Sequence, residues 1–161
     1  MKYKFIILVL ISFSILSCSK DTVLEEVDAS QFISGTIAIT EAEEKLFDLI
    51  NQHRKNLQLN TLSLEATSYH YAGEHTDYMI SKGNTSHDKF EERAKAISDK
   101  TGAKFVAENV AKDYDTVEEA LEAWLESSGH KKNIEGEYTH SALSIKEDSN
   151  GNLYFTQIFF R

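Results

Sequence analysis

The chain of 161 residues contains no proline and a single cysteine, Cys18. Without proline, its turns depend on Gly, Asn, Asp and Ser. One cysteine excludes an internal disulfide framework and any zinc or redox site built on paired cysteines. Positive charge is also scarce: 17 Lys and Arg residues stand against 26 Asp and Glu residues, a formal net charge of −9. Nucleic-acid binding needs a basic face, so this composition argues against that class of partner.

Long apolar runs are missing as well. Residues 5–16 are apolar apart from two serines, but 12 residues are too few for a stable helix across a bilayer. Lys2 and Lys4 precede this run, and Leu-Ser-Cys ends it at Cys18. A short positive segment, an apolar run and this ending resemble a bacterial lipoprotein signal peptide with its lipobox. The alternative is an ordinary signal peptide followed by an incidental cysteine.

These features predict three parts. Residues 1–17 are expected to be the signal peptide, residues 18–39 a lipidated Cys18 with its tether, and residues 40–161 one domain. The acyl chains would hold the protein to a membrane, because an acidic chain gains little from anionic lipid. We therefore expect a protein of the bacterial cell envelope, anchored by lipid, whose domain lies outside the cytoplasm.

The domain shows helical patterns first and strand patterns last. Hydrophobic residues make up 41% of the chain, enough for a packed core. We expect helices over 41–57, 65–82 and 88–100, a fourth helix capped by Asp115, a brief strand over 105–110, a loop over 127–138, and strands over 139–146 and 153–160. Helices followed by a strand pair indicate an α+β fold rather than alternating βαβ units.

Six histidines in an acidic chain raise the question of a metal site. His70 and His75 are five residues apart on one expected helix, so they do not share a face as the zincin pair does. We interpret both, together with the helical His53, as ordinary surface or core histidines. His87 and His130 differ, because each lies at a helix mouth or in a loop beside small residues.

Glu108 lies between these two histidines in the sequence, inside the apolar segment Val106-Ala107-Glu108-Asn109-Val110. A carboxylate within a short apolar strand must be paired or functional. Two neutral imidazoles and a carboxylate form an ordinary ligand set for zinc. The spacing of His87, Glu108 and His130 alone does not decide between this metal site and an incidental grouping.

Several motifs occur in the order found in one superfamily. They are Leu49-Ile50-Asn51-Gln52-His53-Arg54, Ser86-His87-Asp88, Ala107-Glu108-Asn109-Val110-Ala111, the segment from Ala123-Trp124 through Ser127-Ser128-Gly129-His130 to Asn133-Ile134, and Tyr154-Phe155-Thr156-Gln157-Ile158-Phe159. With them, residues 40–161 resemble a CAP domain, found in cysteine-rich secretory proteins, antigen 5 and plant pathogenesis-related 1 proteins. The similarity is greatest to bacterial SCP-like extracellular proteins.

This resemblance implies a three-layer α-β-α sandwich with a small, mainly antiparallel sheet. It also implies a cleft that gathers two histidines and two acidic residues. By matching position, three of these are His87, Glu108 and His130, the residues that would hold Zn²⁺. Ser127 stands where animal members have the second acidic residue, and Glu126 lies one position earlier. The chain also lacks the disulfides of the family.

Three functions are compatible with these residues. The first is a non-enzymatic envelope protein whose cleft binds a divalent metal or a small ligand, as family members are linked to zinc, to sterol or lipid, and to protein partners. The second is a metal-assisted hydrolase acting on peptide or cell-wall material. The third is a structural or interaction module in which the histidines and Glu108 form a hydrogen-bonded cluster. The first is the interpretation we favour.

Overall fold

The computed structural model describes residues 37–161. The expected signal peptide, Cys18 and nearly all of the tether lie outside the described residues. Within residues 37–161, no helix is both long and apolar enough to cross a membrane.

The described chain forms five helices and one four-stranded sheet. The elements are, in order, α1 (Glu41–Asn56), β1 (Ser63–Leu64), α2 (Ala66–Lys82), α3 (Phe90–Thr101), β2 (Val106–Lys112), α4 (Val117–Glu126), α5 (Ser128–Ile134), β3 (His140–Glu147) and β4 (Leu153–Phe160). The strand order is β1-β3-β4-β2. Strand β1 runs parallel to β3, and the other two pairs are antiparallel. The α+β class and the mainly antiparallel sheet are therefore confirmed.

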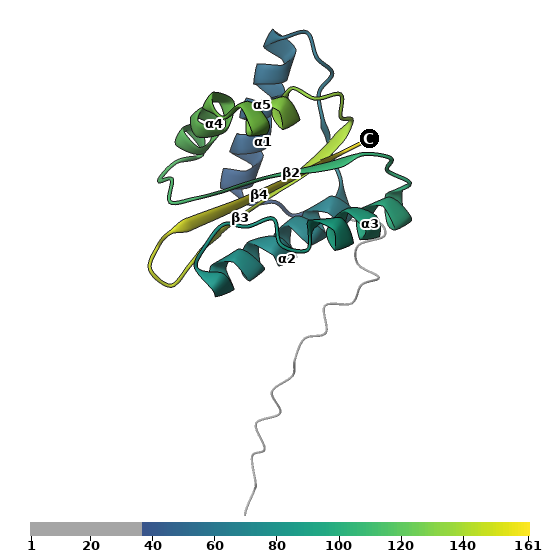
Figure 1. Cartoon of the computed structure of the whole chain (residues 1–161). Helices are drawn as coiled ribbons and strands as arrows, with labels where there is room; N and C mark the ends of the chain where they lie inside the picture. Colours follow the sequence, from purple (N-terminus) through teal and green to yellow (C-terminus); the bar gives the residue numbers. More distant parts are fainter. Residues whose placement is uncertain (1–36) are drawn as a thin grey trace, which may run out of the picture.

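Helices cover both faces of the sheet, as Figure 1 shows, with α1, α4 and α5 on one side and α2 and α3 on the other. Strand β4 supplies both cores, because its alternate side chains point to opposite faces. Phe155 and Phe159 pack with Trp124 and the α1 residues on the first side. Ile158 packs with α2 and α3 on the second. The three-layer arrangement follows from this alternation.

The N-terminus of α1 is fixed by a capping box. Thr40 Oγ1 accepts from Glu43 N–H at 3.2 Å, and Glu43 Oε2 accepts from Thr40 N–H at 2.8 Å. Glu43 also reaches the sheet, where its Oε1 accepts from Ile145 N–H at 2.9 Å. Its Oε2 further accepts from the Tyr69 hydroxyl, and burial together with this carboxylate raises the pKa of Tyr69 to about 12. One side chain thus joins α1, α2 and β3.

Arg54, in the last turn of α1, is fully buried. Its guanidinium donates to the carbonyl oxygens of Ile134 at 2.6 Å and Gly136 at 2.8 Å, just where α5 ends. It also donates to the carbonyl oxygens of Asn60 and Tyr138. Burial lowers the pKa of this guanidinium. Arg54 therefore ties α1 to the connections that flank α5 and β3.

Two expectations about local structure are wrong. The segment expected to be a loop over 127–138 contains α5, a helix of seven residues. Such a short helix is marginal by itself and shows no periodic signal, so tertiary contacts from Arg54 and the buried Ile134 stabilise it. The N-cap of α4 is Thr116, which forms a capping box with Glu119, instead of Asp115. Asp115 precedes this box, and its N–H donates to Glu119 Oε2 at 3.1 Å.

The substitution Arg54→Lys tests the role of the buried guanidinium. Lysine keeps the charge but has three donors on one nitrogen, so it leaves several buried carbonyl oxygens without a partner. We expect the free energy of unfolding in urea to fall by about 3 kcal/mol. The exposed neighbour Lys55 provides the control, and Lys55→Ala should change it by less than about 0.5 kcal/mol. Equal stability of the wild type and Arg54→Lys would contradict this role.

Candidate functional site

Glu108 is the acidic centre of the candidate site. It lies in the middle of β2, and its side chain points to the face of the sheet covered by α2 and α3. Only 1% of this side chain is exposed. A buried carboxylate needs a compensating charge and a full set of donors, and both are present. Glu108 is therefore paired, which is one of the two outcomes expected for a carboxylate in this strand.

Arg93 in α3 supplies the compensating charge. Its Nε donates to Glu108 Oε2 at 3.0 Å, and its Nη2 lies 2.9 Å from Oε1 and 2.8 Å from Oε2. Such two-pronged pairing is the strong form of an arginine–carboxylate contact. Arg93 Nη1 also donates to the carbonyl oxygen of Asp88 at 2.6 Å. The same side chain thereby holds the loop before α3 against β2.

His87 lies in that loop and contacts the same carboxylate. Its Nδ1 is 2.9 Å from Glu108 Oε1. Because a carboxylate paired with arginine only accepts hydrogen bonds, Nδ1 carries the proton and donates it. In the neutral ring, Nε2 then keeps its lone pair. The side chain is 52% exposed, so the ring also reaches solvent.

His75 on α2 completes the contacts of Glu108. It is buried, and its Nε2 donates to the carbonyl oxygen of Ser86 at 2.7 Å while lying 3.6 Å from Glu108 Oε1. Burial lowers the pKa of His75, although the charge of Glu108 opposes this shift. The ring therefore supports the loop that carries His87, and it belongs to the cluster despite our interpretation of it as an ordinary histidine.

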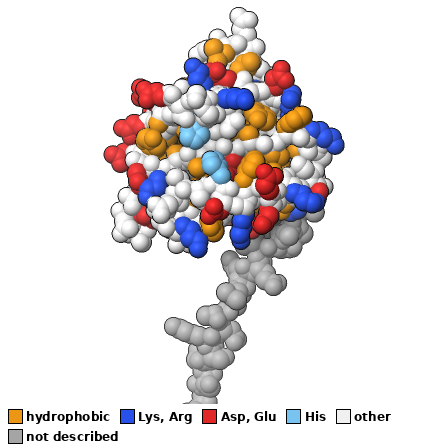
Figure 2. All heavy atoms as spheres, in the orientation of Figure 1, with side chains coloured by type: hydrophobic (Ala, Val, Ile, Leu, Met, Phe, Trp, Pro, Cys, Tyr) orange, Lys and Arg blue, Asp and Glu red, His pale blue; other side chains and the backbone are white. Residues whose placement is uncertain are grey.

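His130 approaches from the opposite side, on α5. Its backbone carbonyl accepts from Asn109 Nδ2 at 3.1 Å, and its ring centroid lies 6.4 Å from that of Trp124. Asn133, one turn further along α5, donates to the carbonyl oxygen of Glu108 at 3.3 Å. Burial and then the charge of His87 lower the pKa of His130, which keeps its ring neutral at pH 7. Figure 2 shows two histidine side chains close together at the centre of this face.

Two small pockets adjoin these histidines along β2. One, of about 280 Å³, is lined by His87 and Glu108 together with Phe90, Val106, Ala107 and Asn133. The other, of about 300 Å³, is lined by His130 and Trp124 together with Thr85, Tyr114, Ser127 and residues 110–112 of β2. Each histidine therefore lines a pocket beside β2, and the two pockets together are called the groove below.

The described residues do not form a closed metal centre. Within residues 37–161, no group of three or more His, Cys, Asp or Glu side chains is placed to hold a metal ion. Both oxygens of Glu108 already accept hydrogen bonds, so this residue orients His87. Ser127 lines the groove and Glu126 is exposed, and neither supplies a second acidic group beside the histidines.

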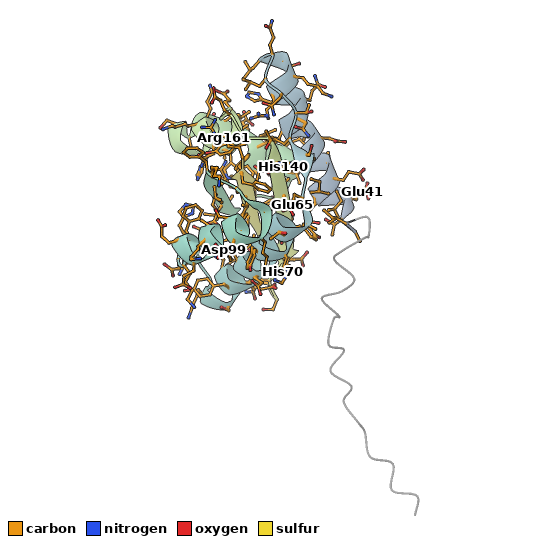
Figure 3. The ribbon with its side chains drawn as sticks, turned by 90° about the vertical axis from the view of Figure 1, so that its right-hand side faces the viewer. Glu41, Glu65, His70, Asp99, His140 and Arg161 are labelled. Carbon is orange, nitrogen blue, oxygen red and sulfur yellow. The ribbon has the colours of Figure 1, made fainter. Side chains whose placement is uncertain are left out.

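The remaining histidines have other partners. His53 pairs with Glu135 at 2.9 Å, and His140 stacks on Phe160 with 4.8 Å between ring centroids. His70 lies 3.6 Å from Glu74 on the same helix. Figure 3 shows His70 and His140 on the side of the molecule that lies to the right in Figure 1. For His53 and His70, these positions agree with their interpretation as ordinary histidines.

Sequence reasoning missed the roles of Arg93 and His75. The one available signal was the need of Glu108 for a buried cation, which names the residue type but not its position. The pairing of Arg93 with Glu108 spans 15 residues, and that of His75 spans 33. Neither separation arises from a local repeat such as that of a helix or a strand, so no sequence pattern predicts these contacts.

Comparison with known proteins shows the same fold and sequence pattern. The uncharacterized protein YkwD of Bacillus subtilis is 30% identical over 122 residues, which are 71% of this chain and 46% of YkwD. The chain thus spans about half the length of this curated relative. An SCP-domain extracellular protein from Bacillus anthracis is 26% identical, with a TM-score of 0.66 over 80% of this chain and 45% of its own. An outer surface protein of Borrelia burgdorferi has a TM-score of 0.70 at 19% identity, over 80% of this chain and 98% of its own.

A family model agrees with these likenesses. The model of the Cysteine-rich secretory protein family, CAP, matches residues 47–159, which include the second half of α1, the histidine-bearing loop, β2, α5 and nearly all of β4. The chain belongs to the CAP family of cysteine-rich secretory proteins.

Proposed function

We propose that this chain is a lipid-anchored binding protein of the bacterial cell envelope, whose His87–His130 groove takes a divalent cation or a small ligand without catalysing a reaction. The hydrogen bond from His87 Nδ1 to Glu108 carries this proposal. A histidine that binds a metal through one nitrogen commonly donates the other N–H to a carboxylate, which fixes its tautomer and orientation. Glu108 does this for His87, and Arg93 compensates its charge.

Zn²⁺ is the cation that two neutral imidazoles favour. His87 would offer Nε2 and His130 a ring nitrogen, while Glu108 holds the His87 ring in place. A cation bound in this way would act as a Lewis acid that attracts oxygen or nitrogen donors of a ligand. Two side-chain ligands give weak, reversible binding, in contrast to structural zinc sites, which have four.

A metal-assisted hydrolase acting on peptide or cell-wall material is less well supported. Within residues 37–161, no side-chain hydroxyl is hydrogen-bonded to His87 or His130. Both carboxylate oxygens of Glu108 accept hydrogen bonds from Arg93 or His87, and its side chain is 1% exposed, so it is poorly placed to act as a general base. The arrangement favours binding.

A purely structural role is a second candidate, because one observation favours it. Glu108 in β2 contacts α3 through Arg93, α2 through His75 and the intervening loop through His87. This cluster would stabilise the domain even if the groove stayed empty. The exposure of the His87 ring is what favours the binding role.

The envelope location rests on the N-terminal sequence and on the family. Residues 1–18 have the pattern of a lipoprotein signal, and Cys18 is the only cysteine of the chain. Two of the similar structures come from an outer surface protein and an extracellular protein. Both support a domain held outside the cytoplasm.

Zinc titration by calorimetry tests the binding role. At pH 7.5 the wild type should bind Zn²⁺ weakly, and the double variant His87→Ala with His130→Ala should lose this binding while staying folded by circular dichroism. His70→Ala, an exposed histidine outside the groove, is the matched control and should bind like the wild type. Equal uptake by the double variant would place the metal elsewhere. No uptake by the wild type would support the structural role.

Zinc affinity should also depend on pH. A protonated imidazole has no lone pair for the metal, so affinity should fall as pH drops through about 6.5, the ordinary imidazole pKa. Because the pKa of His130 is lowered, this ring competes less for protons near pH 6 than a free imidazole does. At pH 5.5 we expect affinity at least about tenfold lower than at pH 7.5. Equal affinity at both values would exclude imidazole ligands.

The variant Cys18→Ala tests the anchor. Without its thiol the chain offers no cysteine for acylation, since Cys18 is the only one. We expect the protein to leave the membrane fraction or to accumulate unprocessed, as judged by fractionation and by mass spectrometry of the N-terminus. Ser17→Ala, which keeps a small residue before the cysteine, should remain membrane-bound. Membrane association and processing that are the same in Cys18→Ala and the wild type would refute lipidation.

A further inference from the structure

The outer edge of β2 forms the floor of the groove between His87 and His130. In the strand order β1-β3-β4-β2, this strand has one neighbour, β4. An edge strand leaves every second residue with its N–H and carbonyl pointing away from the sheet. What these groups do depends on which residues face outward.

The backbone hydrogen bonds identify the outward residues. Phe105 and Arg161, which continue the β2–β4 pairing, exchange two bonds of 3.2 and 3.1 Å, and Asp113 N–H donates to Leu153 at 3.0 Å. In an antiparallel pair, bonded and non-bonded positions alternate. The odd-numbered residues of β2 therefore bond to β4, and the even-numbered residues, Glu108 and Val110 among them, face outward.

The outward carbonyl oxygens already have partners. Asn133 Nδ2 donates to the Glu108 oxygen at 3.3 Å, and Trp124 Nε1 donates to the Val110 oxygen at 3.2 Å. The outward N–H groups differ, because no acceptor within residues 37–161 takes a hydrogen bond from Glu108 N–H or Val110 N–H. Glu108 as a whole is 6% exposed whereas its side chain is 1% exposed, so its main chain reaches the groove.

The spacing and surroundings of these two N–H donors indicate which kind of ligand fits them. Two N–H groups that are two residues apart on a strand lie roughly 7 Å apart, the spacing of alternate carbonyl oxygens in another extended chain. Apolar side chains flank them, with Phe90 and Val106 in the pocket on one side and Tyr114 and Trp124 in the pocket on the other. A peptide with apolar residues at alternate positions matches both features.

Charge favours neutral acceptors over an anion. The chain carries a formal charge of −9, which repels acidic ligands, and Arg93 is already paired with Glu108. Peptide carbonyl oxygens accept strong hydrogen bonds without a net charge. The carbonyl oxygens of Glu108 and Val110 each keep a second lone pair, which peptide N–H groups can use.

We propose that an extended peptide binds along the outer edge of β2, with alternate carbonyl oxygens accepting from the N–H groups of Glu108 and Val110 and apolar side chains entering the two flanking pockets. This is strand addition to a sheet edge that has one neighbouring strand. The inference rests on the proposed function, since it uses the same groove, but it does not require a bound metal.

Site-resolved amide hydrogen exchange of the ¹⁵N-labelled full chain in detergent micelles tests this inference. In the free protein, Glu108 and Val110 should exchange at least about a hundredfold faster than the bonded Ala107 and Asn109. The probe is the blocked pentapeptide acetyl-Leu-Ser-Leu-Ser-Leu-amide. At millimolar concentration it should slow exchange at Glu108 and Val110 by about tenfold and leave Ala107 and Asn109 within about twofold. The bonded amides thus serve as internal controls.

Three results would overturn the inference. They are strong protection of Glu108 and Val110 in the free protein, no added protection with the pentapeptide, and equal protection by inorganic phosphate, which would make the groove an anion site. Phe90→Ala should lower the affinity for the pentapeptide several-fold. Leu57→Ala, which changes an exposed leucine at the end of α1, should leave this affinity unchanged. Equal affinity of Phe90→Ala and the wild type would exclude the pocket at this end.

Zinc separates this inference from the proposed function. The same sample is titrated with Zn²⁺ while the imidazole signals of His87 and His130 are followed. If zinc shifts these signals but the pentapeptide gives no protection, the peptide inference fails and the metal-binding function stands. If the pentapeptide protects both amides but zinc shifts nothing, the groove binds peptide without a metal. If neither occurs, both are wrong.

Discussion

The buried ion pair between Glu108 and Arg93 is the interaction on which the site depends. A carboxylate in the middle of a sheet strand is tolerated only with a cation and donors around it, and removing one partner of such a pair typically costs about 3–5 kcal/mol. Here the partners come from α3, from α2 and from the loop between them. The same bonds that satisfy the charge therefore set the position and tautomer of His87. The stability of this part of the domain and the orientation of the His87 ring therefore have one physical cause.

On the other face of the sheet, the buried cation Arg54 has the corresponding role. Arg54 donates to carbonyl oxygens at the end of α5, and α5 carries His130. Trp124 and Asn133 then fasten α4 and α5 to the edge of β2 through its outward carbonyl oxygens. The groove is held open between two anchored walls, so its shape needs neither metal nor disulfide. This is how a single-cysteine member of the CAP family keeps the arrangement of a family named for its cysteines.

Features that depend on interactions between residues near each other in the chain could be predicted from the sequence. The expected helices over 41–57 and 65–82 agree with α1 and α2 to within one residue, because local signals set their ends: the capping box of Thr40 and Glu43 starts α1, and Gly83 ends α2. The short helix α5 was not predicted, because it is stabilised by Arg54, about eighty residues away in the chain. The contact of His87 with Glu108 was expected only from family resemblance, since a separation of 21 residues carries no geometric information. The partners of Glu108 were missed for the same reason: charge balance demands a cation but does not say which one.

The tautomer of His87 tests the account most directly. Nitrogen chemical shifts of the imidazole at pH 7.5 distinguish a proton on Nδ1 from one on Nε2, and Zn²⁺ can be added to the same sample. We expect an Nδ1–H ring in the wild type, with zinc shifting Nε2, and a loss of this tautomer preference in Glu108→Gln. A wild-type ring protonated on Nε2, or a preference that Glu108→Gln leaves intact, would contradict the claim that Glu108 orients His87 for binding.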